Sequence, residues 1–443
     1  MTISGPTTSD GGTPPIRWLA RATQALAVAL LLYLPFEALL LELVPGNLYW
    51  PARLLPDASI ALLTGVALVL DRGMPRVPRW LLIGLIVGSL IYLVADLARG
   101  FAPADTVNAL RVVLRYVPLG ILLLRFSPVL PWLSATLFWT LTASGLLQVL
   151  AGIVEVAVRT GWSRVGDVAP FFLVEGGTGR YDRFGMVMVA LTLLVLARTG
   201  PGIGPALPRW GYALAGVALV MLFLSTSRQG MLALCVAAAV VALLPGWPRQ
   251  RRLAAAGLAA LALGMAVVVP QPVLLGTGDP NDPETDVTSR GQMALSLNPN
   301  RNFRLYLAVV LAPWAIAQEP LLGFGPGEHD TTSPDPRLSR FVRDSGMSWA
   351  RARRFTNDSN YASLAIQFGL PLLLAYLAGL VAALRVVVRR AIAGHRLAVF
   401  ALAYGVAVLV AANLGPAFET RTTSVILWTF LLAACADPPA PPA

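Results

Sequence analysis

The sequence predicts an all-α polytopic membrane protein that crosses the bilayer about twelve times. Apolar residues make up 56% of the 443 residues and charged residues only 13%, whereas soluble domains carry about 25% charged residues. The apolar residues gather in runs of roughly 17–25 residues, the length with which an α-helix spans the hydrocarbon core. Because the runs lack the two-residue alternation of a transmembrane β-barrel, helices are the expected elements.

Twelve apolar runs are the expected spans, and one long polar segment divides them. The first nine runs lie at 23–44, 54–70, 80–97, 109–124, 131–156, 184–196, 211–224, 230–244 and 253–269, and the last three at 361–384, 397–414 and 422–436. The expected division is therefore a tail at 1–22, helices 1–9 within 23–269, a large loop at 270–360, helices 10–12 within 361–436 and a tail at 437–443.

Arginine sets the expected orientation. The chain has 34 Lys+Arg against 23 Asp+Glu, for a net charge of +11, and every basic residue is arginine. Three short loops are rich in it: Arg72, Arg76 and Arg79; Arg249, Arg251 and Arg252; and Arg385, Arg389, Arg390 and Arg396. Since cytoplasmic loops concentrate positive charge, these loops and both tails are expected inside and 270–360 outside. This placement explains the basic excess without a nucleic-acid partner.

Two other features of the sequence narrow the class of protein. Cys235 and Cys435 lie inside apolar runs, without the spacing of a metal site or a disulfide framework. The first 16 residues are polar and lack the charged start and cleavage site of a signal peptide, so the first apolar run is expected to be a retained anchor. In the large loop, 303–317 is apolar enough for a helix at the membrane interface.

Three stretches carry candidate chemistry. The first is LSTSRQG at 224–230, where Arg228 can bind phosphate beside hydroxyls and a helix start, or snorkel to the interface. The second is NFRLY at 302–306 followed by PLLGFGPG at 320–327, which has no nucleotide-binding GK[ST] and can be a simple loop. The third is TNDSNYASL at 356–364 leading to QFGLP at 367–371, where Asp358 or Ser359 can cap the tenth span.

In this order, the three stretches resemble the O-antigen ligase and O-unit polymerase superfamily of bacterial inner-membrane glycosyltransferases. Members show a Ser-x-Ser-Arg-Gly-like motif, an arginine ahead of Pro-Leu-(Leu)-Gly-x-Gly in a large periplasmic loop, and a His-Asn-x-x-Leu-like motif before Gly-Leu-Pro. Arg228, Arg304 and 320–327 match the first two motifs. The third departs, because Asp358-Ser359 stands where the ligases have His-Asn. This departure tilts the interpretation from ligase toward repeat-unit polymerase.

The resemblance implies a reaction and a set of roles. A glycan passes from undecaprenyl diphosphate to a sugar hydroxyl on a glycan or on lipid A-core, at the periplasmic face of the inner membrane. Arg228 and Arg304, assisted by Arg183, are expected to bind the diphosphate without a metal or other cofactor. Asp358 is the first candidate for the catalytic base and His329 the second.

Two other classes of function stay open on the sequence. A transporter or flippase of lipid-linked oligosaccharide would also be polytopic, but such proteins often show inverted repeats, and no half-to-half similarity is evident here. A membrane scaffold would leave the outer arginines to bind anionic lipid head groups. The basic stretch at 336–355, for its part, can be a solvated or lipid-facing surface.

Overall fold

The computed structural model describes the helical body of the protein. It covers residues 17–130, 132–160, 181–198, 210–245, 247–268, 306–325, 359–415 and 420–436, and residues 178, 202, 203, 206, 207, 337, 340, 341, 344, 417 and 418. The described residues are almost entirely helical, with one isolated β-bridge between Ile203 and His395. The tail at 437–443, residues 1–16 and most of the expected loop at 270–360 lie outside the described residues.

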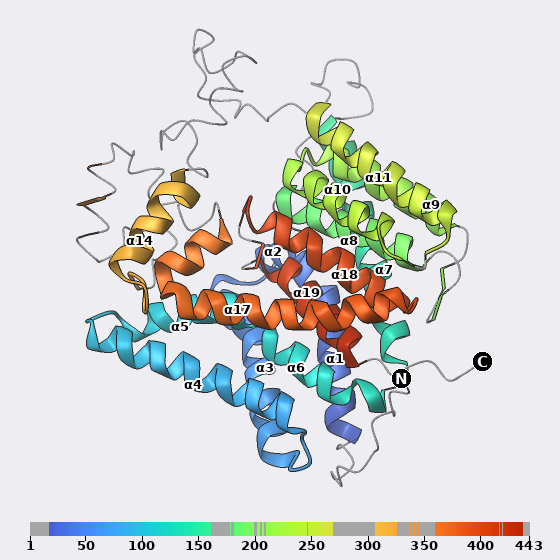
Figure 1. Cartoon of the computed structure of the whole chain (residues 1–443). Helices are drawn as coiled ribbons and strands as arrows, with labels where there is room; N and C mark the ends of the chain where they lie inside the picture. The colour runs from blue at the N-terminus through green and yellow to red at the C-terminus, as the bar shows by residue number, and fades with distance from the viewer. Residues whose placement is uncertain are drawn as a thin grey trace, which may run out of the picture.

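The helices follow one another in the order that the apolar runs predict (Figure 1). The amino-terminal helices are α1 (Arg17–Tyr33), η1 (Leu34–Phe36), α2 (Glu37–Glu42), η2 (Gly46–Leu48), α3 (Tyr49–Leu70), α4 (Arg76–Ala98), α5 (Pro103–Leu114), α6 (Val117–Phe126), η3 (Ser127–Val129) and α7 (Leu133–Thr160). The remainder are α8 (Tyr181–Arg198), α9 (Gly211–Leu224), α10 (Arg228–Ala242), α11 (Arg249–Val268), η6 (Leu307–Leu311), α14 (Ala312–Gln318), α17 (Asn360–Ile392), α18 (Arg396–Ala411) and α19 (Arg421–Ala436).

The polytopic membrane class is confirmed, while the number of spans is established only in part. Six described helices or helix pairs are long and apolar enough to cross a membrane, or seven if the bent pair α5 and α6 is one span. Four of the other expected spans, α9, α10, α18 and α19, are shorter apolar helices of 14–16 residues. Such helices reach about 21–24 Å, less than the ~30 Å hydrocarbon core. The count of twelve spans therefore stays a prediction.

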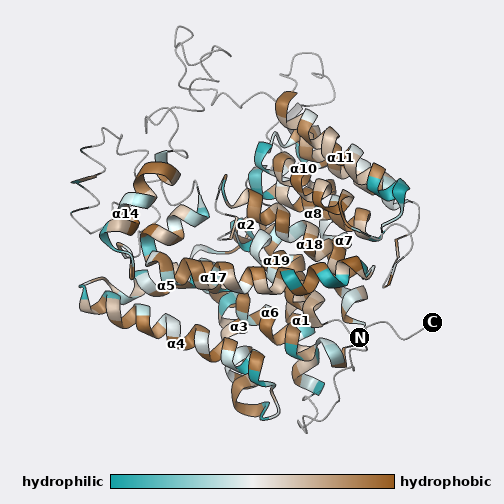
Figure 2. Cartoon of the chain, viewed as in Figure 1, coloured by the Kyte–Doolittle hydropathy of each residue, from teal (hydrophilic) through white to brown (hydrophobic). Residues whose placement is uncertain are grey.

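The core lies where the later helices pack together. Helix α10 packs against α11 and α18, and α19 packs against α6 and α18. Helix α18 is buried along most of its length. In contrast, α4 lies at the edge of the bundle and exposes apolar side chains such as Val94, which is 65% exposed (Figure 2). An exposed apolar surface of this kind suits contact with lipid chains.

The predicted tenth span is broken inside α17. Gly369 has a positive φ of 74°, which interrupts the helix and leaves carbonyls of the preceding turn without helical partners. The backbone N–H of Phe324 donates to the carbonyl of Ile366 at 2.7 Å, and Gly325 N–H donates to Gln367 at 3.1 Å. The segment at 320–325, expected as a turn-rich loop, therefore docks into this break.

Two glycines make the close approach of these backbones possible. A Cβ on Gly323, whose φ is 64°, would lie 2.6 Å from the backbone of Gln367 and of Gly369. A Cβ on Gly369 would lie 2.7 Å from the backbone of Leu321 and Pro320. The Leu370 N–H donates to the Pro320 carbonyl at 2.9 Å and completes the junction. The segment that follows Arg304 in sequence is thus held firmly against a membrane helix.

We expect Gly323→Ala to loosen this junction. An L-residue at positive φ costs roughly 1–2 kcal/mol, and the added methyl also meets backbone that cannot rotate away. The free energy of unfolding should fall by at least about this amount, measured as a lower thermal midpoint in detergent. Gly65→Ala is the matched control, because nothing lies within 4 Å of that position in α3. Equal midpoints for the two variants would contradict the docked junction.

Candidate functional site

Arg228 lies at the amino terminus of α10, at a strained turn. The preceding Thr226 has a positive φ of 53°, which is uncommon for a β-branched residue. Ser227 occupies the N-cap position, and its hydroxyl accepts a hydrogen bond from the Gly230 N–H at 3.2 Å. This turn delivers the half-buried Arg228 side chain to the start of a helix, where the helix dipole favours an anion.

Arg183 enters from α8, and the turn before α10 packs against the same helix. A Cβ on Gly185 would lie 2.5 Å from the side chain of Ser227, so the start of α8 packs closely against the turn that precedes α10. Arg183 lies two residues before Gly185 in α8 and is half-buried. The structure thus brings two of the three predicted phosphate-binding arginines, Arg183 and Arg228, onto adjoining helix starts.

The other predicted site residues, Arg304, Asp358 and His329, lie outside the described residues. Their described neighbours, however, belong to one buried cluster. Tyr306 packs with Phe324 and with Ala362 near the start of α17. Asn360 is tied to the segment between α18 and α19, since its N–H donates to the Ala412 carbonyl at 2.9 Å. The described residues that follow Arg304 and Asp358 in sequence therefore share one buried cluster, through Tyr306 and Ala362.

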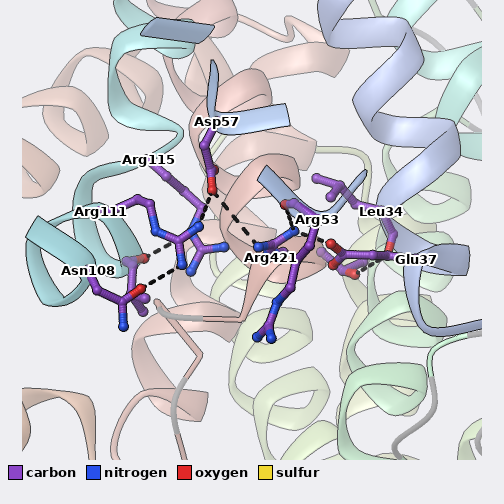
Figure 3. Close-up of polar contacts among 10 residues, drawn as sticks. Leu34, Glu37, Arg53, Asp57, Asn108, Arg111, Arg115 and Arg421 are labelled. Carbon is purple, nitrogen blue, oxygen red and sulfur yellow. Dashed lines mark hydrogen bonds and ion pairs between the residues drawn. The ribbon is translucent and has the colours of Figure 1, made fainter. Parts of the chain in front are cut away.

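A second group of charges was missed in the sequence. We call it the polar cluster, and it comprises Glu37, Arg53, Asp57, Arg111, Arg115 and Arg421 (Figure 3). Arg421, at the first position of α19, forms an ion pair with Glu37 and lies 3.9 Å from Asp57. It also donates to the Arg53 carbonyl at 2.9 Å. Arg111 bonds Asp57, and donates to Asn108 at 2.7 Å.

The polar cluster carries more positive than negative charge. Its four arginines face two carboxylates, and the Arg421 and Glu37 side chains are only 11% and 12% exposed. Arg115 is 8% exposed, and its Nη1 atom has no hydrogen-bond partner. Its Nε donates weakly to the Val112 carbonyl at 3.3 Å. Buried charge without a counter-charge is costly, so this arrangement is suited to receive an anion.

A sequence signal for the polar cluster existed. Glu37, Arg111 and Arg115 stand inside the first and fourth expected spans, at 23–44 and 109–124, and a charged residue inside a span indicates function by default. The spacing of Arg111 and Arg115 also places both on one helix face. What the sequence could not show is that helices distant along the chain, α2, α3, α5 and α19, bring their charges together.

The described part of the chain shows no metal centre. Among those residues, no group of three or more His, Cys, Asp and Glu side chains is arranged to hold a metal ion. The acidic residues of the polar cluster are instead paired with arginine.

Comparison with known proteins identifies the family to which one segment of the chain is similar. Residues 213–377 match the family model described as O-antigen ligase, and a search of curated proteins finds no match. The matched segment runs from α9 into α17, so it includes Arg228, Arg304, the docked segment at 320–325 and Gly369. The chain is thus a multi-pass membrane protein that carries an O-antigen ligase family domain at 213–377.

Proposed function

We propose that the protein transfers a glycan from undecaprenyl diphosphate to a sugar hydroxyl at the periplasmic face of the bacterial inner membrane. The convergence of Arg183 and Arg228 on adjoining helix starts, inside and beside the O-antigen ligase domain, carries this proposal. We further propose that the acceptor is another repeat unit rather than lipid A-core, because Asp358-Ser359 replaces the His-Asn pair of the ligases.

In the proposed reaction, the acceptor hydroxyl attacks the anomeric carbon of the donor sugar. A new carbon–oxygen bond forms, and the bond from the anomeric carbon to the diphosphate oxygen breaks. The hydroxyl proton passes to a base, and the electron pair of the broken bond leaves with the diphosphate. The catalytic requirement is therefore to stabilise the negative charge that grows on the leaving group.

Arginine meets this requirement. Arg228 offers a planar pair of donors to phosphate oxygens, and the first N–H groups of α10 add to the positive potential. Arg183 approaches from α8, and Arg304 is proposed to complete the set. With three guanidinium groups on the diphosphate, the reaction needs no divalent metal, and we expect full activity in the presence of EDTA.

The proposed base is Asp358, with His329 as the second choice. Asp358 immediately precedes Ser359, the buried N-cap residue of α17, which makes no side-chain capping hydrogen bond of its own. The start of α17 is fixed by Asn360, whose side-chain oxygen accepts from the Phe418 N–H at 2.7 Å. We therefore propose that the carboxylate next to this fixed helix start receives the proton of the acceptor hydroxyl.

Deletion of the gene tests the type of transfer. A polymerase predicts that cells without the protein accumulate glycans of a single repeat unit. A ligase predicts long polymer that stays on the lipid carrier, and this outcome would contradict the polymerase assignment. Gel separation of the cell's glycans, with the lipid-linked fraction isolated, reads out both. Restoration by the wild-type gene controls for secondary effects.

Arg228 tests the leaving-group role. We expect Arg228→Lys to lose nearly as much transfer activity as Arg228→Ala, because lysine binds phosphate as a point charge and cannot make the bidentate pair. A fall of about 10²–10³ in kcat is the order expected for loss of one such group. The exposed Arg252 provides the control, since Arg252→Lys should leave transfer unchanged. Normal kcat in a folded Arg228→Lys protein would remove Arg228 from this role.

Asp358→Asn tests the proposed base. Ser359 is the N-cap residue of α17, and asparagine is in any case as compatible with a helix start as aspartate, but it cannot accept the hydroxyl proton. We therefore expect this variant to keep the wild-type thermal midpoint and to lose most of its transfer to a lipid-linked oligosaccharide. A variant with full activity would remove Asp358 from the role of base, and His329→Gln would then be the next substitution to assay.

A further inference from the structure

An apolar groove ends at the polar cluster. The groove has a volume of about 400 Å³ and lies among α3, α4 and α5, between side chains such as Ile60, Leu85 and Leu110. Asp57, Arg111 and Arg115 belong to the same lining. The groove thus combines walls suited to a hydrocarbon chain with a charged end suited to an anion.

The groove continues along α4. A second cavity, of about 450 Å³, shares Leu85, Ser89, Leu110 and Leu114 with the first and extends to α17. Apolar side chains that line the groove are exposed, including Ile86 at 46% and Leu90 at 52%. Since α4 contacts mainly α5 and α6, a lipid can enter sideways from the bilayer.

Arginine outnumbers carboxylate at the charged end of the groove, where Asp57 faces Arg111 and Arg115. Arg115 is more than nine-tenths buried, and its Nη1 atom is without a hydrogen-bond partner. The nearby Asp57 bonds Arg111 through Oδ2, which also lies 3.9 Å from Arg421, and its Oδ1 makes no hydrogen bond to Arg115. A phosphate would supply both the missing charge and the missing acceptor atoms.

The arginines of the polar cluster come from a different part of the chain than Arg228 and Arg304. Arg111, Arg115 and Arg421 all lie outside the O-antigen ligase domain at 213–377, whereas Arg228 and Arg304 lie inside it. The chemistry that family members share is the departure of the carrier diphosphate. The second substrate, in contrast, keeps its lipid and its phosphates through the reaction, and it needs a separate anchor.

We propose that the groove along α4 and the polar cluster bind the lipid-linked acceptor, with a polyprenyl chain in the groove and its phosphate against Arg115 and Arg111. This inference rests on the proposed transfer between two polyprenyl-linked glycans. It assigns to the carrier of the acceptor a site on α3, α4 and α5, and it leaves the donor diphosphate to Arg183, Arg228 and Arg304.

The test compares two acceptors in the full-length protein. The donor is a lipid-linked oligosaccharide whose own acceptor hydroxyl has been removed, and the acceptor glycan is supplied either on polyprenyl diphosphate or free of lipid. Wild-type protein should show a kcat/KM about tenfold or more higher for the lipid-linked acceptor, the order expected for one charge-assisted hydrogen bond. In Arg115→Gln this preference should disappear, through a loss of kcat/KM with the lipid-linked acceptor.

Two further variants test the groove itself. Ser89→Trp, on the shared wall of the two cavities, should also abolish the preference without changing any charge. Val94→Trp on the same helix, which lines neither cavity, and Arg252→Gln, which removes an exposed charge, should keep it. If Arg115→Gln does not fold, the acceptor preference of Ser89→Trp decides whether the groove binds the lipid of the acceptor.

Two results would overturn the inference: an unchanged preference in both groove variants, or an equal loss with both acceptors. Failure of the proposed function itself looks different, because wild-type protein would then transfer to neither acceptor.

Discussion

Polar groups buried at membrane depth must find their partners within the protein or in a substrate, because lipid chains offer none. The broken helix α17 shows the first solution. Its interruption at Gly369 leaves backbone groups that cannot bond along the helix, and the segment at 320–325 supplies the N–H groups of Phe324 and Gly325. The Tyr92 hydroxyl donates to the Phe368 carbonyl at 2.8 Å and satisfies another of these groups. The same bonds fix the part of the loop that follows Arg304.

The polar cluster shows the second solution, in which the protein meets only part of the requirement. Glu37 and Asp57 pair with Arg421 and Arg111, but Arg115 is left with an unused donor. A bilayer-buried arginine without a full complement of partners is expensive to maintain. In our account an anionic substrate completes the cluster, so the deficit marks binding, whereas the completed junction at Gly369 is structural.

The sequence predicted the elements better than their breaks and contacts. Each expected span corresponds to a helix or a bent helix pair, because apolar runs of this length have few alternatives in a membrane. The break at Gly369 was not predicted, since its positive φ depends on a partner segment, at 320–325, that is remote in the chain. The pattern also predicted more spans than the six or seven for which the described helices are long enough, because α9, α10, α18 and α19 are short.

Of the candidate site, Arg183 and Arg228 were predicted from the sequence, and the helix starts that carry them lie side by side. The polar cluster was missed because Arg421 and Glu37 stand at opposite ends of the sequence.

The central claim is that the arginines on the expected outer side recognise the phosphates of a lipid carrier. A ligand that binds only the folded protein raises its unfolding midpoint, so thermal unfolding in detergent with added lipid measures this recognition directly. The account predicts that polyprenyl diphosphate stabilises the wild-type protein well beyond polyprenol of the same length. It also predicts that Arg228→Ala combined with Arg115→Gln abolishes the difference. Equal stabilisation of wild-type protein by the uncharged polyprenol would contradict the account.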